Sequence, residues 1–322
     1  MAGGPSTPEL AAAVSEAGGL GFLAAGYLVP DVLQEVVERT RALTTRPFGV
    51  NVFIPQPSVA VPEQVAAYAS VIAGEATALG TQLGDARFDD DHWEAKLALL
   101  IELAPAVVSC TFGCPTAEEV AALHAAGCAV VVTVTERREL EVAVRAGADA
   151  VVVQGPEAGG HRGTFDPAAN PSDAPLETAL AELLHRSSVP VIAAGGLMTR
   201  TDVARVLAQG AAAAQLGTAF LLADEAGTRD IHRRALADPS FTTTATTRAF
   251  SGRVARGLEN EFMRHHETDA IAGYPEVHHM TSPLRAAAAA AGDPQRTSLW
   301  AGTGYHQVRP GRAADIVASL TP

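Results

Sequence analysis

Short apolar segments alternate with helical segments along most of the chain, and this alternation limits the folds open to it. Predicted helices begin at signals such as the capping-box pattern of Thr116 and Glu119, and several end in glycine. The apolar segments between them are rich in Val, Ile and Ala, which is typical of strands buried in a parallel sheet. Strand–helix repetition of this kind predicts an α/β fold. The seven predicted strands span residues 20–24, 48–53, 106–111, 129–134, 150–153, 189–194 and 212–217.

A closed (β/α)8 barrel has eight strands, one more than the chain offers. The chain begins with a loop, residues 1–6, and a helix start follows at once at Thr7 and Pro8. We therefore predict a (β/α)8 TIM barrel that lacks its first strand, and we expect that strand to precede Met1. The strands of the chain are accordingly numbered two to eight. The gap beside strand eight would leave polar strand edges that need covering.

We predict that the chain has two parts. Residues 1–239 form the barrel, and residues 55–102 within it form a helical insertion after strand three. Residues 240–322 form an irregular polar segment, with a terminal helix after Pro283 that packs on the barrel. The two helices of the insertion are expected at residues 62–79 and 92–103.

Charge and cysteine content exclude several classes of protein. The chain has 23 Lys and Arg against 36 Asp and Glu, a formal net charge of −13. This charge disfavours nucleic acid and anionic membranes as partners, because both attract basic surfaces. Cys110, Cys114 and Cys128 are too few for a disulfide framework and lack a second pair for a zinc site, so we interpret them as small hydrophobic residues. We find no signal peptide and no apolar run that could span a bilayer, and we expect a cytoplasmic protein.

Two further patterns suggest sites but have simpler explanations. Residues 19–24 match the dinucleotide-binding pattern G-x-G-x-x-A. They follow a helix and open a strand, however, whereas that fingerprint follows a strand and opens a helix. The histidine pairs at 265–266 and 278–279 lack the spacing and the carboxylate of a metal site, so we expect them in a solvated loop. No metal is predicted.

Residues 154–163, which read QGPEAGGHRG, directly follow strand six and are the strongest candidate for an active-site loop. Active sites of (β/α)8 enzymes lie at the carboxyl ends of the strands. Glycine allows the backbone to approach a ligand closely, and His161 can exchange a proton near neutral pH. Neighbouring side chains in a loop often point apart, so we expect Arg162 to lie in solvent.

Two glycine-containing loops predict a phosphate site. Gly195 and Gly196 precede a helix whose free N–H groups and positive dipole end can hold an anion. Gly217 and Thr218 offer a second close backbone approach and a hydroxyl donor. These loops follow strands seven and eight, where barrel enzymes often hold a phosphate. The sequence therefore favours a phosphate-bearing cofactor.

Segments spread in order over nearly the whole chain also carry a family resemblance: 1–4, 17–21, 47–53, 154–163, 193–196, 215–220, 251–257 and 300–304. They resemble the nitronate monooxygenases, formerly called 2-nitropropane dioxygenases. The resemblance implies a TIM-barrel flavoprotein with non-covalent FMN and no metal. It implies oxidation of alkyl nitronates, such as propionate 3-nitronate, by O₂ to a carbonyl compound and nitrite. We expect a monomer or a homodimer.

Site residues follow from the resemblance position by position. His161 matches the family's active-site histidine. It would donate a hydrogen bond to an anionic nitronate or remove the acidic α-proton of a neutral nitroalkane. The implied flavin contacts are Asn51, Gln154 and Gly159. The implied contacts to the ribityl phosphate are Gly196, Gln215, Leu216, Gly217 and Thr218.

Two departures from the family pattern bear on the site. The strand and the proline that usually precede the position of Met1 are absent, and Thr111 stands where some members carry a histidine. Other enzymes share this barrel: FMN-dependent enoyl reductases of fatty-acid synthesis, which have the same Glu-Ala-Gly-Gly-His loop, and NAD(P)H:quinone reductases. Arg162, Gly163 and residues 300–304 favour the monooxygenase. A non-catalytic flavin- or phosphate-binding barrel is a remote alternative, because the full set of polar strand ends argues against it.

Overall fold

The computed structural model describes all 322 residues and is built around a sheet of seven parallel strands. Each predicted strand is found, and strands that follow one another in the chain pair side by side. The curled sheet stays open between β1 and β8, so the fold is a TIM-like α/β barrel that lacks one strand, as predicted. Its strands are β1 (Gly21–Ala24), β2 (Phe48–Phe53), β3 (Val107–Thr111), β4 (Ala129–Val134), β5 (Ala150–Gln154), β7 (Val191–Ala194) and β8 (Ala213–Gln215).

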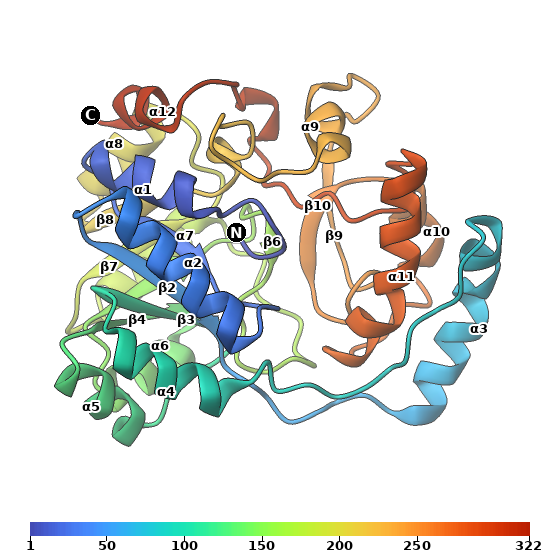
Figure 1. Ribbon diagram of the computed structural model, residues 1–322, viewed down its shortest axis with the longest axis horizontal. Coiled ribbons are helices and arrows are strands. Elements are labelled where there is room, and N and C mark those ends of the chain that lie inside the picture. Colours follow the sequence, from blue (N-terminus) through green and yellow to red (C-terminus); the bar gives the residue numbers. More distant parts are fainter.

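Helices cover this sheet on its outer face (Figure 1). Capping boxes start two of them: Thr116 and Glu119 exchange side-chain-to-backbone hydrogen bonds at α5, as Thr199 and Asp202 do at α8. Helix α12 packs on α1 and α8 (Figure 1). The helices on this face are α1 (Pro8–Glu16), α2 (Pro30–Leu43), α4 (Trp93–Leu103), α5 (Ala117–Ala125), α6 (Arg137–Ala146), α7 (Leu176–Leu184) and α8 (Arg200–Ala208), with α12 (Ala313–Leu320) outside them. Helix α9 (Asp230–Ala237) lies away from the sheet (Figure 1) and contacts η2 (Tyr305–Gln307), the second of two short 3₁₀ turns after η1 (Thr218–Phe220).

The main core lies between the strands and these helices and is filled by 32 buried side chains. Cys110 and Cys128 are among them, and all three cysteines are free. The interpretation of these two cysteines as small hydrophobic residues is confirmed. None of the helices combines the length and the apolar character needed to cross a bilayer.

A second group of elements lies beside the barrel (Figure 1). An antiparallel sheet pairs β6 with β10 and β10 with β9, and a separate apolar cluster joins α3 to α10 and α11. Tyr68 of α3 donates a hydrogen bond to the Ala249 carbonyl (2.7 Å). Because α3 packs with residues beyond 240, the division at that residue stays a proposal. The elements are α3 (Pro62–Ala78), β6 (Gly160–His161), β9 (Thr244–Thr247), β10 (Ala255–Leu258), α10 (Glu261–His266) and α11 (Glu276–Ala291).

Three expectations for the C-terminal part are wrong. The histidine pairs lie on α10 and α11, not in a solvated loop, and His266 is 7% exposed. Helix α11 starts at Glu276 and contains Pro283, and a further helix, α12, follows it. Val277, Met280 and Leu284 of α11 are buried in one apolar cluster. The helix places these side chains on one face, and their burial outweighs the helix-breaking tendency of Pro283. The segment expected to be irregular also contains β9, β10 and α10.

Candidate active site

The predicted site residues lie at the carboxyl edge of the parallel sheet or on the loop after β5. Strand register aligns the ends across the sheet, because Gln154 pairs with Ala194 and Ala194 with Gln215. Asn51 lies near the end of β2, opposite Ser109. The structure therefore brings together residues that are more than 160 positions apart in the chain. Their contacts with a cofactor remain a prediction.

Gln154 holds the loop that carries His161. Its Nε2 donates to the His161 carbonyl (3.0 Å), and its Oε1 accepts from the Gly163 amide (2.8 Å). On the other side of the loop, β6 pairs with β10, where His161 lies opposite Ala255. Both polar atoms of the Gln154 side chain are thus used by the protein, and its first role is to fix the position of the histidine.

The His161 ring is held by one hydrogen bond and three aromatic neighbours. Nε2 lies 2.8 Å from Ser251 Oγ. The ring centroids of Phe112, Tyr274 and Trp300 lie 5.9, 5.7 and 5.4 Å away. Burial, reinforced by two nearby arginines, lowers the pKa of His161 to about 3. The imidazole is therefore neutral at pH 7.

Ser251 also indicates which tautomer His161 adopts. The Ser251 hydroxyl donates to the Arg253 carbonyl (3.2 Å), which has no other hydrogen-bond donor. Having given its proton there, the hydroxyl oxygen accepts from His161 Nε2–H. This assignment follows from the hydrogen-bond network. It leaves Nδ1 with a free lone pair and no protein partner, which suits a proton acceptor.

Asn51 is anchored by the neighbouring strand. Its Nδ2 lies 2.9 Å from Ser109 Oγ and 3.1 Å from Thr111 Oγ1, while Oδ1 has no protein partner. Thr111, which stands where some family members have histidine, therefore positions Asn51. One side-chain acceptor of Asn51 stays available to a ligand.

The two loops expected to hold phosphate differ from the prediction in one respect. The start of α8 is already capped, because Asp202 Oδ2 accepts from the amides of Met198 and Thr199. Of the first three N–H groups of the helix, only that of Asp202 has a partner, Thr199 Oγ1 (3.2 Å), but a carboxylate already occupies the positive end of the helix. More free donors lie just before it: the amides of Gly195, Gly196 and Leu197 make no hydrogen bond, nor do those of Leu216 and Gly217. These two runs follow adjacent strands.

Glycines give the two loops their shape. Gly195 and Gly196 have φ of +126° and +67°, in the left-handed region that favours glycine. A Cβ at Gly159 would lie 2.5 Å from the amide nitrogen of Gly302, so the loop after β5 packs directly on the backbone of that segment. Gly302 in turn donates from its amide to Thr218 Oγ1 (3.0 Å). The Gln215 side chain is exposed and makes no hydrogen bond with the protein.

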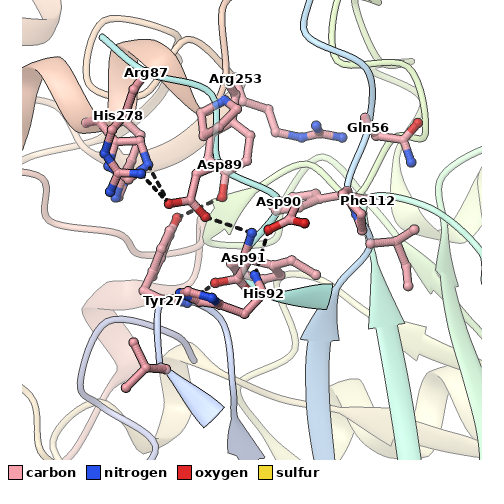
Figure 2. A pocket seen from close by; sticks show the side chains of 17 residues that line it. Tyr27, Gln56, Arg87, Asp89, Asp90, Asp91, His92, Phe112, Arg253 and His278 are labelled. Atoms are coloured by element: carbon pink, nitrogen blue, oxygen red, sulfur yellow. Dashed lines mark hydrogen bonds and ion pairs between the residues drawn. The ribbon is translucent and has the colours of Figure 1, made fainter. Parts of the chain in front are cut away.

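A cavity of about 230 Å³ lies beside Phe112 and Tyr274, two of the aromatic neighbours of His161. Figure 2 shows Tyr27, Phe112, Arg253 and His278 around this space, with Asp89, Asp90 and Asp91 between them in this view. The rings of Tyr27 and His278 stack, with centroids 4.5 Å apart. The walls combine aromatic rings with a larger number of polar and charged side chains, which can orient a small polar ligand.

Several residues of this cavity carry no signal in the sequence. Tyr27, Phe112 and the neighbouring pair Tyr274 and His278 come from three separate segments, and only the fold brings them together. The prediction that Arg162 lies in solvent is wrong: it is 2% exposed, with Nη2 near the carbonyls of Gln154 and Ser172 (3.4 Å each). The pairing of β6 with β10 turns the loop inward, which the sequence could not show.

A loop histidine at the carboxyl edge of a parallel α/β barrel, with an aromatic cavity beside it, is the arrangement of a barrel enzyme. The family model described as "Nitronate monooxygenase" matches residues 1–322, and the chain belongs to this family. It is therefore an oxidoreductase. No group of three or more His, Cys, Asp or Glu side chains is placed to hold a metal ion.

Similarity to individual proteins agrees with this family assignment. The chain is similar to a nitronate monooxygenase from Paraburkholderia phytofirmans, at 40% identity over 98% of this chain and 88% of that protein. The solved structure of a nitroalkane oxidase from Streptomyces ansochromogenes is 51% identical, with a TM-score of 0.95, over 99% of this chain and 92% of that one. FabK from Thermotoga maritima is 26% identical, with a TM-score of 0.76, over 99% of this chain and 89% of that one.

Proposed function

We propose that this protein binds FMN and oxidises alkyl nitronates with O₂ to a carbonyl compound and nitrite. Family membership supports oxidation of nitronates as the reaction class. The observation that carries the proposal is His161, a neutral and fixed imidazole at the carboxyl edge of the barrel, beside an aromatic cavity.

The residues present fit FMN. Two adjacent runs of free backbone amides, at 195–197 and 216–217, would hold the phosphate. The free Asn51 Oδ1 and the backbone near Gly159 lie toward the other strand ends, where the isoalloxazine would contact them. Bound FMN would supply the electron transfer between substrate and O₂.

The protein's own part is to bind, orient and deprotonate. With Nε2–H donated to Ser251, His161 Nδ1 would take the α-proton of a neutral nitroalkane and so produce the nitronate in place. In the protein alone the pKa of His161 is too low for an efficient base, so the negative charge that forms on the nitro group would have to raise it. A substrate supplied as the nitronate needs no such step. Phe112, Tyr274 and Trp300 would enclose the reacting carbon and limit the access of water.

A purified sample tests the proposal directly. We expect a yellow protein whose flavin absorbance changes on anaerobic mixing with 1-propyl nitronate but not with NADH or NADPH. In air, the nitronate should give nitrite. Reduction by a nicotinamide but not by the nitronate would reject the proposal in favour of an enoyl or quinone reductase. A colourless protein that cannot be loaded with FMN would reject all three flavin-dependent functions: nitronate oxidation, enoyl reduction and quinone reduction.

A further inference from the structure

Arg253 is a buried cation that has no role in the proposed reaction as described above. It is 2% exposed and lines the cavity, with its guanidinium carbon 4.0 Å from the centre of the Phe112 ring (Figure 2). No carboxylate lies within ion-pair distance of it. Buried charges in proteins are nearly always paired, because leaving water is costly for an ion.

Hydrogen bonds account for only part of the guanidinium. Nε donates to the Arg162 carbonyl (3.3 Å), and Nη2 donates to the Thr164 carbonyl. Nη1 makes no hydrogen bond with the protein, and it is not among the fully buried polar atoms without a partner. One end of Arg253 thus braces the segment after His161, and the other is left for the cavity.

Bracing alone does not explain why this position carries a charge. A neutral donor could serve the carbonyls of Arg162 and Thr164. The face of Phe112 favours the cation by a modest amount, which does not replace an anionic partner. Glu139 is a buried carboxylate that acts on Arg253 from a distance, but it accepts hydrogen bonds from Thr135 and Phe165 instead. The remaining partner must come from outside the chain.

We propose that Arg253 Nη1 binds the anionic group of the substrate, so that this arginine makes the site prefer a nitronate to its neutral parent nitroalkane. The inference rests on the proposed function for its substrate class. Arg253 and His161 both lie against Phe112 and Tyr274, so a small planar anion between these rings would meet both. Nη1 carries two N–H donors and a share of the positive charge, so it can donate charge-assisted hydrogen bonds to the oxygens of a nitronate.

Other charges around the cavity do not supply this contact. Arg87 is mostly exposed and paired with Asp89 (2.6 Å). Arg285 lies behind His278, hydrogen-bonded to it and to Ser282, and does not line the cavity. Asp90 is exposed at the rim, where solvent screens its repulsion of an anion.

Binding of an unreactive pair of probes tests the proposal apart from turnover. Butyrate resembles 1-propyl nitronate in shape and charge, and butyramide is its neutral counterpart. Calorimetry on the FMN-loaded protein should show butyrate binding at least about 10-fold more tightly than butyramide. Arg253→Gln should remove this preference, while Arg186→Gln, a change at an exposed arginine outside the cavity, should keep it. A wild type without the preference, or an Arg253→Gln variant that retains it, would overturn the proposal.

Arg253→Lys covers the case in which the glutamine variant does not fold. One ammonium cannot both brace Thr164 and reach the cavity, so butyrate should bind about 3- to 10-fold more weakly with butyramide unchanged. Equal weakening of both probes would mean a purely structural role and would refute the inference. Loss of FMN with an unchanged preference would also refute it, by placing Arg253 at the cofactor.

Turnover adds a second readout. The ratio of kcat/KM for 1-propyl nitronate to that for 1-nitropropane should fall at least about 10-fold in Arg253→Gln. An unchanged ratio would count against the proposal. A wild type that binds butyrate selectively but releases no nitrite from nitronates would reject the proposed function and leave the anion site standing.

Discussion

His161 combines a fixed orientation with a low affinity for protons. Burial first, and then the positive charges of Arg253 and Arg285, lower its pKa to about 3. An imidazolium is therefore absent at neutral pH, and the positive charge that an anionic substrate requires has to come from another side chain. The site therefore uses two different side chains: a neutral proton acceptor, His161, and a separate cation.

Replacement of the histidine tests the acceptor. His161→Asn should lower kcat for 1-nitropropane by about 10²- to 10⁴-fold, because no other side chain replaces the lost base. Turnover of the preformed nitronate should fall much less, since that substrate has already lost its proton. FMN content should stay at the wild-type level, measured by absorbance of the purified protein.

His265→Asn is the matched control, because His265 is an exposed histidine on α10. It should leave both activities unchanged. An equal loss with nitroalkane and nitronate in His161→Asn would contradict a role as base and indicate a general effect on the site.

The loop after β5 is held at three points: by Gln154, by the pairing of β6 with β10, and by the contact of Gly159 with Gly302. The third contact involves backbone on both sides. A methyl group there has no flexible side chain to displace, so one of the two segments must move.

Gly159→Ala should therefore lower the free energy of unfolding by about 1–3 kcal/mol and reduce turnover through displacement of His161. Urea unfolding followed by tryptophan fluorescence measures the first effect. Gly74→Ala is the control: Gly74 lies in α3 with open space around it, and alanine there should stabilise the protein by up to about 1 kcal/mol. Equal stability of the two variants would exclude the close contact at Gly159.

The segment over the cavity is tied down by a buried ion pair. Lys96 Nζ lies 2.7 Å from Asp91 and donates to the Ala25 carbonyl (2.9 Å), while Asp91 accepts from the Tyr27 amide (2.9 Å). The Lys96 side chain is 1% exposed and that of Asp91 18%. Loss of either partner would leave a largely buried charge without compensation.

Lys96→Met should destabilise the protein by about 2–3 kcal/mol, somewhat less than for a fully buried pair because Asp91 reaches some solvent. It should also weaken substrate binding by loosening Asp91 and Tyr27. Arg137→Met, which removes a half-exposed pair with Glu141, should cost less than about 1 kcal/mol. Chemical denaturation of both variants gives the comparison. Similar decreases in the free energy of unfolding would show that the buried Lys96 pair stabilises the protein no more than the half-exposed pair does.

Elements set by local pattern could be predicted, and those set by distant contacts could not. The strands and the capping box at Thr116 depend on neighbours in the sequence, and they appear where expected. Arg162 depends on β10, a partner strand that begins 93 residues later in the chain, and its burial was missed. The candidate active-site loop could be proposed because glycine and histidine directly follow a strand, whereas Arg253 and the aromatic residues of the cavity have no such marker.

Several histidines in different parts of the folded protein are neutral at pH 7 because their pKa values are lowered. Burial lowers the pKa of His232 on α9 to about 4 and that of His278 on α11 to about 2, and His161 behaves alike. These positions belong to different elements, so their protonation opposes the entire fold. Each folded pKa lies below the value of about 6.5 for an unfolded histidine. The unfolded chain therefore binds more protons as pH falls below that value.

Stability should accordingly be full above about pH 6.5 and decline as pH falls toward the folded pKa values. The free energy of unfolding, measured in urea between pH 7 and 5, should drop, with His232 contributing up to about 1.4 kcal/mol per pH unit. His232→Gln should flatten the dependence by that amount, because glutamine does not titrate. His185→Gln, a change at an exposed histidine, should keep the wild-type slope. If His232→Gln also keeps it, acid sensitivity has another origin, and the buried histidines do not govern how the fold responds to pH.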